Sequence, residues 1–213
     1  TKRIPIAAGL GGGSSDAAAT LIGLNDLWDL GLSRPELLPL AARLGSDVSF
    51  FLRPEPFAVG RGRGDVCESI PHARRLSHVL VIPDAQLSTK EIYEQAQWDL
   101  PPPPNMGKTG EKYIWWGGLT ASKPSLTMVL HALSNGSLSE LAEGLWNDLE
   151  PEAIRRCPSS ALIVSHLRDL GCLGVRLSGS GPAVFGLCSD LQQAQEVAAQ
   201  VRGRAAPSWR VES

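Results

Sequence analysis

Pro5-Ile6-Ala7-Ala8-Gly9-Leu10-Gly11-Gly12-Gly13-Ser14-Ser15-Asp16-Ala17-Ala18-Ala19 runs from four glycines and two serines directly into an alanine-rich stretch. Glycines let a backbone approach an anion closely and adopt positive φ angles. The first turn of a helix adds unpaired N–H groups and the positive end of its dipole. This junction therefore predicts a phosphate-binding loop that leads into a helix.

Two well-known phosphate loops do not fit this stretch. A Walker loop requires a lysine after its second glycine, and no lysine occurs between Lys2 and Lys90. A dinucleotide fingerprint requires a third glycine where this chain has Ser14, after Gly9 and Gly11. The stretch is therefore a phosphate loop of another kind.

The residues after the glycines favour a helix over a flexible linker. Apolar residues recur with a period of about 3.6 and predict one buried face, formed by Ala17, Leu21, Leu24 and Trp28. Ser15 and Asp16 are the N-cap candidates. Asp16 is interpreted first as the cap, because a carboxylate near phosphates repels them unless it faces away or reaches a cation.

The pattern resembles the second motif of the GHMP kinases, and three later stretches are similar to other motifs of that family in the same order. These stretches are Leu44-Gly45-Ser46-Asp47-Val48-Ser49-Phe50-Phe51-Leu52, with Ser49 where proline is usual, then Asn147-Asp148-Leu149-Glu150-Pro151, and then Leu177-Ser178-Gly179-Ser180-Gly181-Pro182-Ala183-Val184-Phe185-Gly186-Leu187. The resemblance implies a two-domain α+β fold. Residues 1–75 would form an incomplete N-terminal ATP-binding domain like domain 2 of ribosomal protein S5, and residues 76–213 a ferredoxin-like C-terminal domain.

The resemblance also implies an activity, namely ATP-dependent transfer of a phosphoryl group to an alcohol, with ATP and Mg²⁺ as cofactors. The motifs look most like those of family members that phosphorylate the 2-hydroxyl of a cytidine diphosphate-linked methylerythritol in non-mevalonate isoprenoid synthesis. Two alternatives remain open. One is another GHMP kinase, of the homoserine or mevalonate type, and the other is a non-catalytic phosphate-binding remnant.

Phosphoryl transfer needs positioned phosphates, neutralised charge and an oriented hydroxyl. By resemblance, Asp47 is the catalytic base that accepts the proton of the attacking hydroxyl, although its position after Gly45 by itself favours a helix N-cap. The resemblance assigns ATP binding to Pro5, Ile6, Ala7, Ala8, Gly9, Leu10, Gly11, Gly12, Gly13, Ser14 and Ser15. Either of the two serines could contact phosphate or Mg²⁺, and the sequence does not decide between them.

Further residues are substrate-binding candidates. Thr89 and Tyr93 lie one helical turn apart and share a face, and matching positions in the family line the substrate site. An ordinary half-buried role for Tyr93 is equally compatible with the spacing. In the glycine-rich third motif, Gly179, Ser180 and Gly181 could hold the phosphate loop or the substrate diphosphate, and a plain glycine hairpin is the alternative.

The family begins with strands that carry a lysine paired with the catalytic aspartate. This chain opens with Thr1 directly before the glycine motif, and Lys2 matches a different family position. We therefore expect a partial sequence that is unstable or inactive alone, while the full-length product is a kinase.

Composition disfavours several other classes of protein. The 213 residues carry a formal net charge of -2, and their basic residues are scattered, so no nucleic-acid partner is expected. The chain shows no apolar run of bilayer length and no leader, which predicts a cytoplasmic protein without a membrane partner. Its cysteines lack paired short spacings, which predicts reduced and partly buried thiols without disulfides or structural metal, namely Cys67, Cys157, Cys172 and Cys188.

The remaining sequence predicts alternating helices and strands of an α+β protein. Helices are expected to Trp28, over 36–44, 125–133, 159–170 and 191–201, and at capping boxes over 88–91 and 137–140. Strands are expected over 57–59, 79–82, 174–177, 183–188 and 209–211. Residues 98–124 form a turn-rich loop whose tryptophans more often pack inward than cover a substrate or partner.

Overall fold

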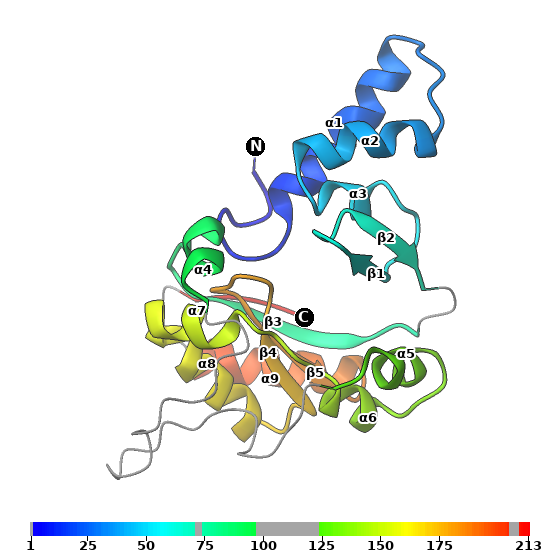
Figure 1. Ribbon diagram of the computed structural model, residues 1–213. Helices are drawn as coiled ribbons and strands as arrows, with labels where there is room; N and C mark the ends of the chain where they lie inside the picture. Colours follow the sequence, from blue (N-terminus) through cyan, green and yellow to red (C-terminus); the bar gives the residue numbers. More distant parts are fainter. Residues whose placement is uncertain (1, 71–73, 97–123, 205–208) are drawn as a thin grey trace.

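The computed structural model describes residues 2–70, 74–96, 124–204 and 209–213, which form an N-terminal and a C-terminal group of elements (Figure 1). The N-terminal group comprises α1 (Gly12–Leu27), α2 (Arg34–Leu44), α3 (Val48–Phe51), β1 (Ala58–Arg61) and β2 (Val66–Ser69). The C-terminal group comprises β3 (Ser77–Ile82), α4 (Thr89–Gln95), α5 (Leu126–Ser134), α6 (Leu138–Glu143), α7 (Glu150–Arg156), α8 (Pro158–Asp169), β4 (Gly174–Leu177), β5 (Val184–Cys188), α9 (Leu191–Arg204) and β6 (Arg210–Glu212).

The C-terminal group is built on an antiparallel sheet with strand order β4-β5-β3-β6. In its register, Leu80 pairs with Phe185 and Val81 with Val211. Helices α8 and α9 pack on one face of this sheet (Figure 1). The order β3, α8, β4, β5, α9, β6 is the β-α-β-β-α-β arrangement of a ferredoxin-like domain, so this part of the expected fold is confirmed.

The main hydrophobic core lies between the sheet and these helices. Apolar residues alternate along the strands so that one set points at α8 and α9. Its fully buried members include Val79, Val81, Val175 and Val184, which pack with Ile163 and Leu167 of α8. Ile92 of α4 joins the same core with no exposed surface. Helix α4 is thus attached to the ferredoxin-like layer rather than to the N-terminal helices.

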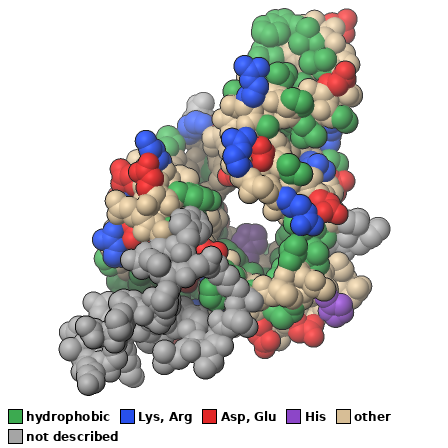
Figure 2. Space-filling view, viewed as in Figure 1, with side chains coloured by type: hydrophobic (Ala, Val, Ile, Leu, Met, Phe, Trp, Pro, Cys, Tyr) green, Lys and Arg blue, Asp and Glu red, His purple; other side chains and the backbone are tan. Residues whose placement is uncertain are grey.

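The N-terminal group has its own small core, formed by Ala18, Leu37, Ala41, Val48 and Leu52. The prediction that Trp28 closes a buried face of α1 is wrong, because this side chain is 62% exposed. Helix α1 ends at Leu27, beyond the part of the helix that α2 and α3 cover. Hydrophobic side chains accordingly gather on the surface over the far ends of α1 and α2 (Figure 2).

Most expected elements are present with boundaries shifted by one to three residues. Strand β2, helix α3 and helix α7 were not predicted, because each is only four to seven residues long and lacks a full period of apolar residues. The expected capping box at Ser137 and Glu140 is confirmed. The predictions for residues 98–124, including their tryptophans, lie outside the described residues.

All four cysteines are free thiols with buried side chains, as predicted. Burial raises the pKa of Cys172 to about 12 and also raises that of Cys188. These thiols therefore stay protonated at neutral pH and act as small apolar core residues. Among the described helices, none is long and apolar enough to span a membrane.

Candidate active site

Two glycine-rich segments that are far apart in sequence meet at the centre of the candidate site. The hydroxyl of Ser178 donates to the carbonyl of Gly9 at 2.8 Å, and the backbone N–H of Ala183 donates to the carbonyl of Ala8 at 3.2 Å. Gly9 has φ 75°, and a Cβ there would lie 2.0 Å from the Ser178 carbonyl oxygen. Only glycine permits this approach, so the first loop and the β4–β5 hairpin form one unit.

The segment that leads into α7 and the first residue of that helix hold the β4–β5 hairpin by hydrogen bonds. The side-chain amide of Asn147 donates to the carbonyls of Leu177 and Gly179 at 3.0 and 2.8 Å. The carboxylate of Glu150 accepts from the backbone N–H of Leu177 at 2.9 Å. Burial raises the pKa of Glu150, against the opposing effect of this hydrogen bond. Asn147 and Glu150 of the Asn147–Pro151 signature therefore position the hairpin.

The N-terminus of α1 differs from the expected capping arrangement. Its N-cap is Gly11 in the left-handed conformation with φ 64°, and no side chain caps the first turn. The Ser15 hydroxyl donates instead to the Gly12 carbonyl at 2.9 Å, and Asp16 forms an ion pair with Lys2. Neither Ser15 nor Asp16 is the cap, because the N-cap is Gly11, four residues before Ser15 and five before Asp16.

This arrangement leaves the first turn of α1 open to an anion. The N–H groups of Gly12, Gly13 and Ser14 begin the helix and have no intrahelical acceptor. A Cβ built on Gly13 would meet nothing within 4 Å, so the space beside Gly13 is free, whereas the side chain of Ile4 packs against Gly12. Backbone donors, the helix dipole and open space are together the features of a phosphate site.

Asp47 faces the same region from α3. It occupies the N-cap position, yet its side chain makes no capping hydrogen bond, and the Ser46 hydroxyl lies 3.3 Å from its Oδ1. A cavity of about 400 Å³ is lined by Asp47 together with Gly9, Leu10, Gly11, Phe50, Phe51, Ala58, Gly60, Gly64, Cys67 and Ser178. The Asp47 carboxylate therefore does not cap α3, and it lines a cavity together with both glycine-rich segments.

Sequence reasoning missed the contribution of β1 and β2 to this cavity. Ala58, Gly60, Gly64 and Cys67 form its far wall. The alternating Gly60-Arg61-Gly62-Arg63-Gly64 run was the available signal, since such a run indicates a tight hairpin. Figure 2 shows the molecule hollowed between the N-terminal helices and the sheet.

Ser49, next to this site, is an unfavourable residue for its position. Its side chain is 1% exposed, and its hydroxyl has no hydrogen-bond partner among the described residues. Ser49→Ala is expected to raise the free energy of unfolding by about 1 kcal/mol, because it removes a buried and unpaired polar group. Urea unfolding measures this change. Ser33→Ala, which removes a satisfied cap of α2, should instead lower stability by about 1 kcal/mol, and a loss in both variants would contradict the assignment.

The substrate-binding candidates lie in the β4–β5 hairpin and on α4, which contacts it. The hydroxyls of Thr89 and Ser180 lie 2.9 Å apart, which joins α4 to the third motif. Gly179 faces Gly9, and Gly181 has φ 71°, so both glycines shape the hairpin. Tyr93 is 52% exposed on α4 and does not line the cavity of Asp47.

No group of three or more potential metal ligands converges within the described part of the chain. A Mg²⁺ ion that arrives with a nucleotide needs only one or two protein oxygens, because phosphates and waters supply the rest. The Asp47 carboxylate and the Ser14 hydroxyl are donors of this type. The residues present therefore fit a nucleotide-borne Mg²⁺ in the chemistry of their donors.

Residues 1–54 match the N-terminal domain of the GHMP kinases, and residues 129–206 match the GHMP kinase C-terminal domain. The chain also aligns with a crystal structure of 4-(cytidine 5'-diphospho)-2C-methyl-D-erythritol kinase with a TM-score of 0.71 and 31% identity, over 99% of this chain and 67% of that one. The chain belongs to the GHMP kinase family.

Two curated relatives are 4-diphosphocytidyl-2-C-methyl-D-erythritol kinases. The protein from Pelotomaculum thermopropionicum is 39% identical over 94% of this chain and 63% of its own length. The protein from Gloeobacter violaceus is 38% identical over 95% of this chain and 62% of its own length. The chain thus spans somewhat less than two thirds of these relatives.

A homoserine kinase from Cytophaga hutchinsonii superposes with a TM-score of 0.74 over the whole chain and 66% of its own length. Its sequence identity is only 20%. This likeness therefore shows the shared fold and carries no information on the substrate.

Proposed function

We propose that the full-length protein to which this chain belongs transfers the γ-phosphoryl group of ATP to the 2-hydroxyl of 4-diphosphocytidyl-2-C-methyl-D-erythritol, in non-mevalonate isoprenoid synthesis. The observation that carries the proposal is the cavity in which Asp47 meets Gly9, Gly11 and Ser178. The relatives at 38 to 39% identity support the choice of substrate within the family.

In this proposal the backbone amides of Gly12 to Ser14 bind the β- and γ-phosphates at the start of α1. They are donors fixed before the reaction, so they stabilise developing charge without reorganisation. Residues Pro5 to Gly11 lead the backbone around the nucleotide, and Ser178 holds Gly9 in place. Since the Ser15 hydroxyl is engaged with Gly12, Ser14 is the serine that we assign to phosphate or Mg²⁺.

Asp47 accepts the proton of the substrate hydroxyl as that oxygen attacks the γ-phosphorus. Its side chain is exposed and lines the cavity, where a positioned carboxylate can act as a general base. The Asp47 carboxylate or the Ser14 hydroxyl would hold Mg²⁺ when it is bound with ATP, and the ion would supply neutralisation of phosphate charge. Thr89, Tyr93 and the hairpin residues Gly179 to Gly181 are assigned to the cytidyl diphosphate part of the substrate. Residues 1–75 and 76–213 are proposed as the two domains.

The test is an ATP turnover assay with the cytidyl substrate, in which this chain is compared with the same chain extended by the residues encoded upstream of Thr1. The extended chain is expected to turn over this substrate in preference to homoserine or mevalonate, and this chain alone is expected to be slow or inactive. Turnover of homoserine or mevalonate in preference would contradict the proposed substrate. Nucleotide binding without any turnover would favour the phosphate-binding remnant.

A further inference from the structure

Helix α4 carries both Thr89 and Tyr93 and enters the core through one fully buried side chain, Ile92. Successive helical residues are rotated by about 100°. Thr89 and Tyr93 therefore lie on one flank of Ile92, while Glu91 and Gln95 lie on the opposite flank. Contacts that hold Glu91 and Gln95 therefore fix the rotation of α4 about its own axis. They thereby also fix the direction in which Thr89 and Tyr93 point.

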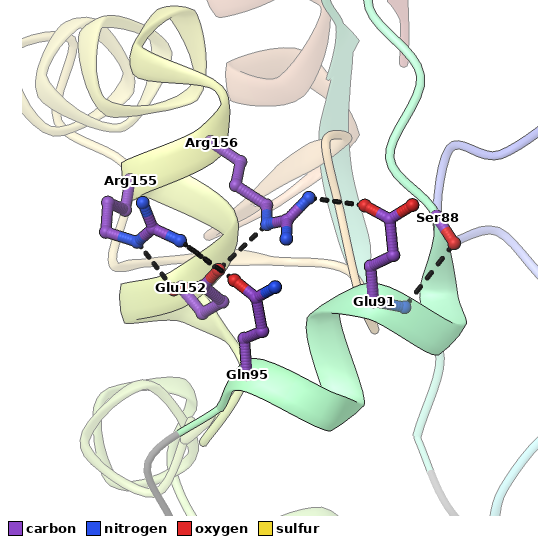
Figure 3. Close-up of polar contacts among 6 residues, drawn as sticks. All are labelled: Ser88, Glu91, Gln95, Glu152, Arg155 and Arg156. Carbon is purple, nitrogen blue, oxygen red and sulfur yellow. Dashed lines mark hydrogen bonds and ion pairs between the residues drawn. The ribbon is translucent and has the colours of Figure 1, made fainter.

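Two arginines of α7 hold that opposite flank (Figure 3). Arg156 Nη1 donates to Glu91 Oε2 at 2.5 Å, and Arg155 Nη2 donates to Gln95 Oε1 at 3.2 Å. The expected capping box at Ser88 is only half formed as a result. Ser88 accepts from the Glu91 backbone N–H, but the Glu91 carboxylate turns to Arg156 rather than back to the cap.

Both arginines are fixed by one carboxylate, that of Glu152. It accepts from Arg155 Nε and Nη2 at 2.7 Å each and from Arg156 Nε at 2.8 Å. Its side chain is 9% exposed and that of Arg156 is 24% exposed. These bonds lower the pKa of Glu152, with Arg155 as the largest cause. The outer members are more exposed, with Arg155 at 63% and Glu91 at 54%. Charge-assisted bonds that share one shielded carboxylate still orient groups better than an isolated surface ion pair.

The other flank of α4 contacts the β4–β5 hairpin through Thr89. Thr89 Oγ1 lies 2.9 Å from the Oγ of Ser180, whose side chain is nearly buried in the hairpin. The same hairpin holds Gly9 through Ser178. A rotation of α4 would therefore displace Thr89 from the hairpin and move Tyr93 with it.

We propose that Arg156 is a positioning residue which, anchored on Glu152, holds α4 through Glu91 and thereby presents Thr89 and Tyr93 to the cytidyl part of the substrate. The proposal deepens the proposed function and rests on it for the identity of the ligand. Arg156 itself touches neither substrate nor nucleotide. It acts through the helix.

The test compares Arg156→Met and Arg156→Lys with the unsubstituted protein, in the extended chain of the turnover assay. Methionine keeps most of the side-chain length and removes every donor, while lysine cannot bridge Glu91 and Glu152 with a planar fork. In Arg156→Met the KM for the cytidyl substrate is expected to rise about tenfold or more, with the KM for ATP unchanged. Arg156→Lys is expected to recover part of this loss.

Amide hydrogen exchange of residues 92–96 supplies a readout that does not require activity. Exchange should accelerate in Arg156→Met and also in Glu91→Met, because each variant removes the bond between Arg156 and Glu91. Lys90→Met is the matched control, since Lys90 is on the same helix and, within the described part of the chain, its ion pair is with the exposed Glu94 at 3.8 Å. This control should change neither exchange nor KM.

The outcomes separate the positioning proposal from the proposed function. If the unsubstituted extended protein does not use the cytidyl substrate, the proposed function fails, and unchanged exchange in Arg156→Met would by itself overturn the hold on α4. If exchange accelerates while the KM for the cytidyl substrate stays the same, the positioning role is overturned. An equal rise in both KM values would indicate general loss of structure and would also overturn it.

Discussion

Replacing Asp47 by asparagine should lower kcat by two to four powers of ten, the usual contribution of a positioned general base. Asparagine keeps the size of the side chain and its hydrogen bond with Ser46, but it cannot accept the proton of the attacking hydroxyl. The affinity for ATP should hardly change, because the backbone amides of α1 bind the phosphates. Steady-state turnover and nucleotide titration of the extended chain measure the two effects separately.

The matched control is Asp26→Asn, because Asp26 is an exposed residue of α1 outside the cavity. It removes the same charge from the protein and should leave kcat unchanged. A similar fall in both variants would assign the effect to net charge. If Asp47→Asn kept full turnover, Asp47 would not be the base, and the cavity would be only a nucleotide site.

The residues predicted best were those whose role depends only on the backbone conformation and neighbouring residues at that point of the chain. Gly9, Gly11, Gly179 and Gly181 all adopt positive φ angles, and a glycine-rich run announces this need without knowledge of the partner. Helix starts at Ser125 and Ser137 follow from the same local logic, because a serine side chain caps the turn beside it. The type of loop and the type of helix start could therefore be predicted from sequence.

The contacts that assemble the site could not be predicted in this way. Gly9 contacts Ser178, which lies 169 residues later in the sequence, and the residue spacing within either motif does not predict this contact. Glu91 was expected to complete a capping box, but an arginine from α7 competes for its carboxylate. Trp28 fits a helical period, yet no described element covers it, and it is 62% exposed. Tertiary contacts decided each of these cases over local pattern.

Resemblance to the family selected Asp47 as catalytic, whereas spacing alone favoured a cap. The structure shows why spacing was a poor guide: Asp47 does stand at the N-cap position of α3, but its side chain does not cap. A residue can occupy a structural position and remain chemically available. The absence of a capping bond, together with the shared cavity, is what makes Asp47 a candidate base on physical grounds.

Gly9→Ala should be the most damaging small substitution at the phosphate loop. A Cβ at this position would lie 2.0 Å from the Ser178 carbonyl oxygen and 2.9 Å from the Gly181 nitrogen. Both are backbone atoms that cannot rotate away, and φ is 75°. The steric overlap, together with the cost of an alanine in the left-handed backbone conformation, is expected to lower the free energy of unfolding by about 2 to 5 kcal/mol. Urea unfolding and ATP titration measure the consequences.

Two further variants show whether the close contact between the loops is responsible. Gly23→Ala places the same methyl group on α1, where nothing lies within 4 Å, and should stabilise the protein by about 0.5 to 1 kcal/mol. Ser178→Ala removes only the bond to the Gly9 carbonyl and should cost about 1 kcal/mol. If the added methyl group pushes the Gly9 loop away from the β4–β5 hairpin, Gly9→Ala will lose ATP affinity with a smaller loss of stability. A Gly9→Ala protein that unfolds and binds ATP like the unsubstituted one would show that the two motifs do not act as one unit.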